Sequence, residues 1–472
     1  MSRNKWIFGI VGVAAIVLVV TLSVALPGRN IESDNHQTTT SGTEQTSDKP
    51  PETIPAQTTP QTTTKPVEES TKPEATETKQ TEISSTKESE TTKVIESETT
   101  IVKETVEPSS EYPIPKDINA KAVYLNAGAA GTPSVIDHII DLASTTELNA
   151  VVIDIKDGPI FYKSEVGYAK EFGLSYHHYD PEAIISQLHE NNVYVIGRLV
   201  CFRDPDLAVK MPELAIQTQS GALWKENGNT AWLNPYHPDA RQYLLDLAVE
   251  AAEKGFDEIQ LDYIRFPTGT GGKDYYGENL PSKIEAIESF LDMAVEALKP
   301  YGVKVTADIF GIVGLSESDG NYIGQHLETV GKNIDYICPM VYPSHYANET
   351  GRVMGNGTGT FLNGVLYKAP DLNPYEIVYG TLLRMRQRLD NTENYKADLR
   401  PYLQAFTASY LPGGYYQHYG PEQIRQQIQA VYDAGYEEWI LWDHNSNYPK
   451  EAFLSKQNTD TTEKAASESQ AE

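Results

Sequence analysis

The chain has 472 residues, a formal net charge of -28 and only two cysteines. This balance excludes an ordinary nucleic-acid-binding protein, because neutralising phosphates requires clusters of Lys and Arg. Cys201 and Cys338 fall in separate predicted strands, so we expect two small buried residues and no disulfide framework. Thr, Ser, Glu, Lys and Pro dominate the first quarter of the chain, which leaves one large folded domain at 113–455.

The N-terminus carries a hydrophobic segment. Arg3 and Lys5 precede an uncharged, mostly apolar run at 6–26, which is long enough to cross a hydrocarbon core of about 30 Å as a helix. We therefore expect 1–29 to be a single-pass membrane anchor that places the domain outside the cytoplasm. A cleaved signal peptide, which would make the protein secreted, is the alternative, because Ser23-Val24-Ala25 offers a small-residue cleavage site.

Two segments have the composition of disordered chain. Residues 30–112 are built mainly from Thr, Ser, Glu, Lys, Gln and Pro with very few aromatic residues, and cannot bury enough apolar surface to offset the cost of ordering the backbone. The sequence predicts a disordered linker there and a similar tail at 456–472.

Within 113–455, short apolar runs alternate with helical patterns, which is typical of repeated strand-helix units around a parallel sheet. Eight strands are predicted, at 120–128, 150–157, 193–200, 256–266, 304–310, 336–343, 399–406 and 437–443. Helices are predicted at 133–146, 180–191, 239–254, 282–298, 325–332, 421–434 and, less sharply bounded, within 374–390. Eight such units predict an α/β fold of the (β/α)8 TIM-barrel type. An open doubly wound sheet is the alternative, but the first helix lacks a Gly-rich nucleotide turn.

The fourth predicted strand shows how the barrel would present its polar residues. Ile259 and Leu261 alternate with Glu258, Gln260 and Asp262, the period of two that separates the faces of a strand. The apolar face is expected to meet the helices, so the polar face lies inside the barrel. Pro267 ends the strand and leaves Asp262 and Arg265 at its carboxyl end, where barrel enzymes build their sites.

The same alternation places further charged residues inside. Asp154 and Lys156 face inward on the second strand, Arg198 on the third and Asp308 on the fifth. Three acids therefore converge on one mouth, with Arg198 between Asp154 and Asp262. Hydrolysis of a glycosidic bond needs one carboxylic acid and one carboxylate, and Asp262 and Asp308 are the best pair.

Structural roles are the alternative for these residues. The inward polar side chains could form a satisfied hydrogen-bond layer without any catalytic duty, because barrel interiors contain ion pairs. Arg265 could be either a loop ion pair or a substrate clamp. Glu258 and Gln260 lie deeper in their strand, which favours a structural layer for both.

The loops after the predicted strands are rich in aromatic and polar residues. Tyr342 and His345 follow the sixth strand, and Trp442 and Asp443 end the eighth. A sugar ring stacks on Tyr or Trp and offers hydroxyls to polar side chains, although core packing would also explain Tyr342 and Trp442. No metal-binding spacing of histidines and no phosphate-binding glycine loop occurs, so we expect neither a metal nor a cofactor.

Five segments carry a resemblance to a known family. They are Val-Val-Ile-Asp-Ile-Lys-Asp at 151–157, Gly-Arg-Leu-Val-Cys-Phe-Arg-Asp at 197–204, the fourth strand, Ala-Asp-Ile-Phe-Gly at 307–311 and Cys-Pro-Met-Val-Tyr-Pro-Ser-His-Tyr at 338–346. Together they resemble the bacterial putative glycosyl hydrolase family over nearly all of 113–455. The resemblance implies a TIM barrel distantly similar to the α-amylase-type glycosidases, with Asp262 as the nucleophile. Those enzymes usually carry a Glu acid on strand five, where this chain has Asp308.

The sequence thus predicts a hydrolase of glycosidic bonds in a cell-surface or extracellular polysaccharide. Asp154, Lys156, Arg198, Arg265, Tyr342, His345, Trp442 and Asp443 are expected to bind the substrate. The competing hypothesis is a non-catalytic carbohydrate-binding or scaffold protein of the cell envelope, because an anchor and a linker would serve either function.

Overall fold

The computed structural model describes residues 118–316, 318 and 320–456. The predicted anchor at 1–29 and linker at 30–112 lie outside these residues, as does the tail beyond residue 456. Within the part that is described, none of the helices combines the length and the apolar character needed to span a bilayer.

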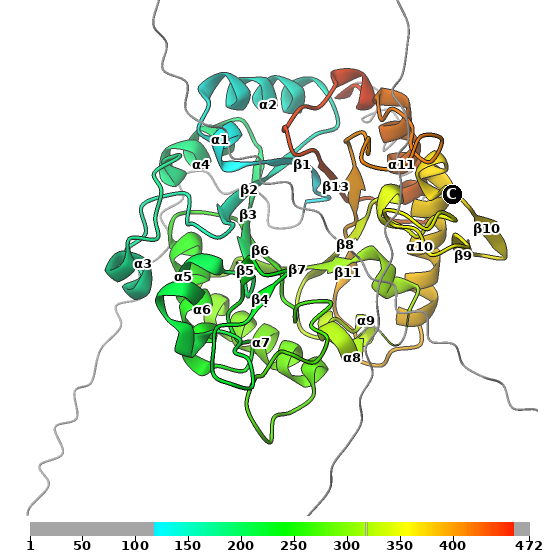
Figure 1. Cartoon of the computed structure of the whole chain (residues 1–472). Coiled ribbons are helices and arrows are strands. Elements are labelled where there is room, and N and C mark those ends of the chain that lie inside the picture. The colour runs from blue at the N-terminus through cyan, green and yellow to red at the C-terminus, as the bar shows by residue number, and fades with distance from the viewer. Residues whose placement is uncertain (1–117, 317, 319, 457–472) are drawn as a thin grey trace, which may run out of the picture. The chain divides into compact units, whose positions relative to one another are not determined.

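Eight parallel strands close into a barrel, as predicted (Figure 1). Each strand pairs with the next around the ring. These pairs include β1 with β13, the first and last strands in the chain, and β7 with β8. The strands are β1 (Lys121–Leu125), β2 (Ala150–Lys156), β3 (Tyr194–Val200), β6 (Glu258–Asp262), β7 (Lys304–Phe310), β8 (Tyr336–Val341), β12 (Tyr402–Gln404) and β13 (Trp439–Trp442). A two-residue strand, β11 (Asp398–Leu399), extends the sheet beside β8.

Helices surround the barrel in Figure 1. The larger ones are α2 (Pro133–Thr145), α4 (Pro181–Glu190), α6 (Pro238–Glu253), α7 (Lys283–Leu298), α10 (Pro374–Leu389) and α11 (Pro421–Asp433). Shorter ones are α1 (Ala127–Ala130), α3 (Gly167–Phe172), α5 (Pro205–Lys210), α8 (Gly320–Ile323) and α9 (Leu327–Val330). The predicted helix at 325–332 is thus reduced to the single turn of α9.

Local sequence signals fix where several helices begin and end. The Asp180 side chain accepts a hydrogen bond from the Ala183 amide at the start of α4, and Ser282 forms a capping box with Glu285 at the start of α7. These bonds satisfy amide groups that the first helical turn leaves free. After α4, Asn192 takes the left-handed conformation, with φ 55°, one residue beyond the end of the helix predicted at 180–191.

The two faces of the strands differ as the alternation predicts. The outward face of β2 and its neighbours, including Val151, Ile153 and Ile259, belongs to the large core shared with the helices. Inside the ring lies a second, smaller cluster that includes Val152 and Ile196. Burial of both faces explains why all seven residues of β2 are buried.

The structure corrects several strand ends. The first strand ends at Leu125, before the predicted Gly128, because the Asn126 side chain caps α1. The fourth ends at Asp262, because Tyr263 has φ 51° and cannot continue the strand. The seventh is divided into β11 and β12 around Pro401, which lacks an amide hydrogen for the ladder.

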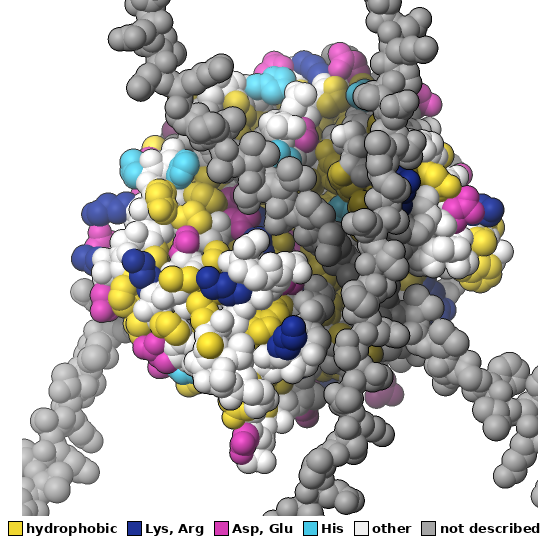
Figure 2. All heavy atoms as spheres, in the orientation of Figure 1, with side chains coloured by type: hydrophobic (Ala, Val, Ile, Leu, Met, Phe, Trp, Pro, Cys, Tyr) yellow, Lys and Arg dark blue, Asp and Glu magenta, His cyan; other side chains and the backbone are white. Residues whose placement is uncertain are grey.

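Two hairpins were not predicted. The β4 (Lys225–Glu226) and β5 (Thr230–Ala231) pair lies in the long connection between β3 and β6, and the β9 (Thr360–Leu362) and β10 (Val365–Tyr367) pair follows β8. Phe361 on β9 is 69% exposed, and apolar side chains are visible over this hairpin at the right edge of the molecule (Figures 1 and 2).

The amino end of the barrel, called the floor here, contains a paired ion network. Arg400 donates to Glu258 at 2.7 Å and to Glu438 at 2.5 Å, and Thr306 donates to Glu258 at 2.8 Å. The Tyr336 hydroxyl donates to Glu438 at 2.9 Å. Each charged group in this network therefore has a partner, which makes Glu258 structural, as the sequence suggested.

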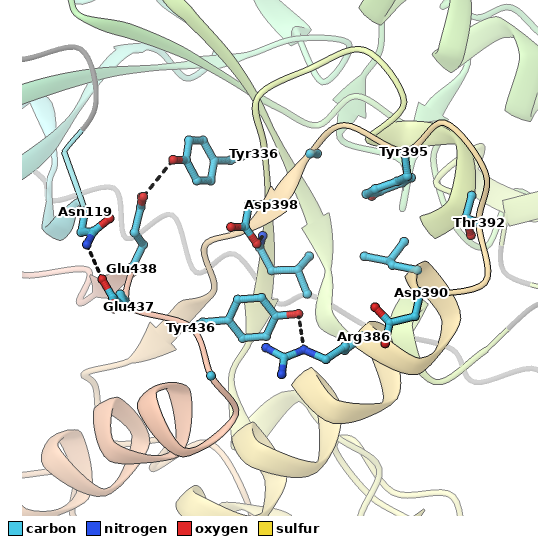
Figure 3. Close-up of a pocket in the computed structure, with 14 residues that line it drawn as sticks. Asn119, Tyr336, Arg386, Asp390, Thr392, Tyr395, Asp398, Tyr436, Glu437 and Glu438 are labelled. Carbon is cyan, nitrogen blue, oxygen red and sulfur yellow. Dashed lines mark hydrogen bonds between the residues drawn. The ribbon is translucent and has the colours of Figure 1, made fainter. Parts of the chain in front are cut away.

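A polar cavity of about 600 Å³ opens beside this floor (Figure 3). Its lining comes from the starts of strands and from the end of α10, including Asn119, Arg386 and Glu437. Asn119 donates to Glu437, and Arg386 contacts the Tyr436 hydroxyl. None of the predicted site residues lines this cavity.

Candidate active site

At the opposite, carboxyl end of the strands, called the mouth here, acidic side chains surround Arg198. The guanidinium of Arg198 donates to Asp154 at 2.6 Å and to Asp262 at 2.6 and 3.0 Å. Its Nε lies 3.9 Å from Asp308 Oδ2, and its Nη1 lies 3.9 Å from Asp157 Oδ2. The structure thus brings together the three acids predicted to converge and places Arg198 between Asp154 and Asp262, as expected.

Asp262 is held from two sides. Its Oδ2 accepts both hydrogen bonds from Arg198, and its Oδ1 accepts one from the Tyr263 backbone amide at 2.6 Å. The strand ends at this point, where Tyr263 adopts a left-handed conformation. Both oxygens therefore act as acceptors, which suits a carboxylate that stays fixed in one orientation.

Asp308 is in a different environment. It is 1% exposed, and its Oδ1 has no hydrogen-bond partner among the described residues. Burial, followed by the negative charge of Asp262, raises the pKa of Asp308 well above its usual range. This environment favours the protonated form of Asp308, because an ionised carboxyl in this position would lack hydrogen-bond donors at Oδ1 among the described residues.

The two carboxyl groups are close together. Asp262 Oδ2 and Asp308 Oδ2 lie 3.0 and 3.9 Å from the same atom, Arg198 Nε, so they are no farther apart than those two distances laid end to end. This maximum distance between the two carboxyl groups is compatible with the separation of about 5 to 5.5 Å found in retaining glycosidases. It is also compatible with the lower end of the range of roughly 6.5 to 9.5 Å found in inverting glycosidases.

Asp154 is the third acid of the mouth. It is 3% exposed and accepts a hydrogen bond of 2.5 Å from the Tyr124 hydroxyl, in addition to the bond from Arg198. Burial raises the pKa of Asp154 from 3.8 to about 6, against the lowering effect of Arg198. Asp154 thus titrates close to neutral pH, between the behaviour of an exposed and a fully desolvated acid.

Aromatic rings form the other side of the mouth. Trp442 on β13 stacks on Tyr124 with ring centroids 5.8 Å apart, and Tyr342 lies 5.9 Å from Trp442 and 5.1 Å from His345. Phe406 makes an edge contact with Trp442 at 5.3 Å. Burial lowers the pKa of His345 to about 4, so this ring is neutral at physiological pH. Tyr342 and Trp442, which were predicted to stack on the sugar, and His345, which was predicted to bind the substrate, therefore share one aromatic wall.

Two predicted substrate-binding residues are occupied elsewhere. Lys156 is completely buried, and its ammonium lies 3.0 Å from Asp204 and donates to the Val200 carbonyl at 3.0 Å. The pairing of β2 with β3 shifts register between Asp154 and Lys156, which interrupts the alternation there. Asp443 accepts bonds from the Asn445 and Asn447 amides with its two oxygens, so it shapes its own loop.

Arg265 and Gln260 differ in the contacts that their side chains make. Gln260 donates to Cys338 Sγ at 3.2 Å and accepts from the Tyr402 hydroxyl at 2.5 Å, which confirms a structural layer below the acids. Cys201 and Cys338 are both buried, as predicted. Arg265 is buried next to the mouth and forms no ion pair with any residue that the structure describes, so the loop ion pair considered for it is absent there.

Three residues of the mouth were missed. Tyr124 was read only as part of a strand, yet the inward face of β1 directs its hydroxyl to Asp154. Asp157, which ends the second predicted strand and was given no role, lies 3.4 Å from Arg203. Phe406, at the end of the seventh predicted strand, gave a detectable signal, because strand-end aromatic residues elsewhere had been selected as stacking residues.

The surface around the mouth is mixed in character. Figure 2 shows acidic, basic and apolar side chains interspersed over the visible part of this face. Among residues 118–316, 318 and 320–456, no group of three or more His, Cys, Asp or Glu side chains is arranged to hold a metal ion.

Comparisons with known proteins identify a family for this chain. Residues 122–448 match the family described as "Putative glycosyl hydrolase domain". No curated protein matches. A hypothetical protein from Ruminiclostridium thermocellum is 43% identical, over 39% of this chain and 96% of its own, with a TM-score of 0.38.

A second solved structure shares the fold across the whole barrel. The glycoside hydrolase domain of PgaB (BpsB) from Bordetella bronchiseptica aligns with a TM-score of 0.51 over 71% of this chain and 99% of its own, at 14% identity. Such low identity supports the fold alone, and the fold agrees with the eight-stranded barrel found here. The family match covers most of the chain, and the protein therefore belongs to the glycosyl hydrolase family named above.

Proposed function

We propose that the barrel hydrolyses glycosidic bonds in a cell-surface or extracellular polysaccharide. The observation that carries the proposal is that two neighbouring carboxyl groups differ in hydrogen bonding and in pKa. Asp262 accepts three hydrogen bonds, two of them from Arg198, whereas Asp308 has no donor at Oδ1 and an elevated pKa. One carboxylate and one carboxylic acid side by side are what this reaction requires.

In this proposal Asp262 is the nucleophile, or the base that activates water, and Asp308 protonates the departing sugar oxygen. Arg198 keeps Asp262 oriented and separates its charge from that of Asp154. The wall of Trp442, Tyr342 and His345 would stack against the sugar ring on the side away from the acids. Family membership and the shared fold support the reaction class.

A non-catalytic carbohydrate-binding or scaffold role is the second candidate. The observation that favours it is the depth of Asp308, which is 1% exposed where Asp262 is 4% exposed. A sugar oxygen would have to approach a carboxyl group that is almost sealed. The wall of Trp442, Tyr342 and His345 and the charged side chains around Arg198 would serve carbohydrate binding equally well.

We also propose that the barrel acts outside the cytoplasm. The apolar run at 6–26 would anchor the protein in the cell membrane, or direct its secretion if the run is cleaved. The Thr-, Ser- and Pro-rich residues 30–112 would then let the domain reach a polysaccharide at a distance from the bilayer.

The test compares full-length protein with its Asp262→Asn variant on a panel of soluble and cell-wall glycans, with release of reducing ends as the measurement. We expect at least one glycan to be cleaved and its cleavage to fall by roughly a thousandfold or more in the variant. Asp246→Asn, an exposed change on α6, is the matched control and should leave the rate unchanged. Equal rates for the two variants would remove Asp262 from the reaction and favour the binding role.

A further inference from the structure

The Arg265 side chain sits in a box of aromatic rings beside the acids. Its guanidinium carbon lies 4.8 Å from the Trp232 ring centre, 4.9 Å from Tyr263 and 4.8 Å from Phe310. Tyr263 directly follows Asp262, and Phe310 is the last residue of β7, two positions after Asp308. The box therefore stands where the two strands that carry the proposed catalytic pair end.

The hydrogen-bonding capacity of this guanidinium is largely unused. One nitrogen of Arg265 donates to the Phe266 carbonyl at 3.0 Å, and this is its single hydrogen bond to a described residue. An arginine has five N–H donors. Glu226, an acid of the nearby β4–β5 hairpin, instead accepts from the Trp232 indole at 3.2 Å and from Thr268 at 3.4 Å.

Other buried arginines of the barrel are neutralised by acids. Arg198 contacts Asp154 and Asp262, and Arg400 contacts Glu258 and Glu438. Arg265 is only 5% exposed and has no carboxylate within 4 Å among the described residues. Loss of hydration lowers its pKa. The charges of Glu226 and Asp262 act on it from beyond ion-pair distance. Burial of a cation without a directly paired anion is unfavourable, and cation–π contacts offset only part of that cost.

We propose that Arg265 binds an anionic substituent of the sugar that occupies the mouth, so that the substrate is an acidic polysaccharide. The inference rests on the proposed function, because it takes the mouth to be the glycan site. A planar guanidinium with free N–H groups matches a carboxylate with two parallel hydrogen bonds, which makes a uronic acid residue the best-fitting sugar. A sulfate ester offers the same oxyanion chemistry and is the other source.

The box also explains why an arginine serves here. Three rings surround the guanidinium at 4.8 to 4.9 Å from its carbon, and a planar guanidinium donates its hydrogen bonds from its edge, in its own plane. An ammonium group would not be oriented in this way. The anion would thereby be held beside Asp262, on the β6–β7 side of the mouth, across the ring from Trp442 on β13.

The experiment measures binding in full-length protein that carries Asp262→Asn, so that no ligand is consumed. Three probes are titrated calorimetrically: a neutral oligosaccharide, a uronate-containing one and a sulfated one. Adding Arg265→Gln should weaken the acidic ligand by roughly 10- to 100-fold and change the neutral ligand less than twofold. Arg265→Lys should give an intermediate loss, and Arg384→Gln, at an exposed arginine of α10, should give none.

The outcomes test anion binding by Arg265 separately from the proposed hydrolysis. Selective loss of the uronate or of the sulfated ligand supports the inference and identifies the anion. An equal change for neutral and acidic ligands, or no binding of any acidic glycan, overturns it, and thermal unfolding of each variant shows whether the fold is intact. If Arg265 selects acidic glycans while Asp262→Asn leaves hydrolysis unchanged, the proposed reaction fails and the anion site stands.

Discussion

The two ends of the barrel bury charge in different ways. At the floor, Arg400 is matched by Glu258 and Glu438, and neighbouring hydroxyl groups complete the hydrogen bonds. At the mouth, Asp308 has an oxygen without a partner, and Arg265 has no carboxylate beside it among the described residues. Complete pairing is explained by the fold alone. Incomplete pairing of buried groups needs another reason, and a substrate supplies one.

The largest expected effect belongs to the floor. Arg400→Met should lower the free energy of unfolding by about 3 to 5 kcal/mol, because it leaves Glu258 and Glu438 buried without their cation. Urea denaturation measures this change, with Arg384→Met as the exposed control. Glycan binding by the folded fraction should stay at the parent level. A loss of less than about 1 kcal/mol would show that the floor is no more dependent on pairing than a surface site.

At the mouth, Asp154→Asn should raise the free energy of unfolding, in contrast to the loss expected at the floor. The folded pKa of about 6 lies above the usual 3.8, so between these values the folded protein retains a proton that the unfolded chain loses. The associated cost is absent below about pH 4 and complete above about pH 6. At pH 7 the variant should be more stable by on the order of 2 to 3 kcal/mol.

Denaturation of both proteins at pH 4 and pH 7 checks this prediction. The difference between variant and parent should grow as the pH rises through the interval. If the difference in free energy of unfolding between the two proteins is the same at both pH values, folding does not disfavour the ionised form of Asp154. Charge burial at the mouth would then be less costly than proposed.

A smaller effect is expected from Tyr124→Phe. The change removes the 2.5 Å hydrogen bond to Asp154 and should cost about 1 to 2 kcal/mol above pH 6, where that carboxylate is charged. Because the hydroxyl also lowers the pKa of Asp154, the pH profile of stability should shift upward. In an Asp154→Asn background the loss should shrink, and a double-mutant cycle measures that coupling. Equal losses in both backgrounds would show that Tyr124 acts through packing with Trp442 instead.

Much of the barrel could be predicted because its pattern is local. The β6 strand alternates apolar and polar residues throughout, and β2 does so from Ile153 to Lys156, so their inner faces could be assigned before any contact was known. The strand ends were harder. The stop at Asp262 depends on the backbone angle of Tyr263, and the end of β1 depends on capping by Asn126, and neither has a strong signal in a single residue type.

The site shows the same division. Asp154, Arg198, Asp262 and Asp308 could be brought together because strand register alone places them at one end of the ring. The ion pair of Lys156 with Asp204 could not be predicted, since the register of β2 shifts between Asp154 and Lys156. The loop of Asp443 depends on side-chain bonds to the Asn445 and Asn447 amides, which a period of two does not encode.

The pairing of β1 with β13 has a consequence for synthesis of the protein. Lys121 is opposite Trp439 and Val123 is opposite Leu441, so the ring has an open seam until almost the last residue of the domain leaves the ribosome. A nascent or truncated chain would present the unpaired edges of β1 and β12, which are templates for aggregation. Expression fragments should therefore keep the chain through Trp442, and a chaperone that acts on this protein would have to shield its first strand longest.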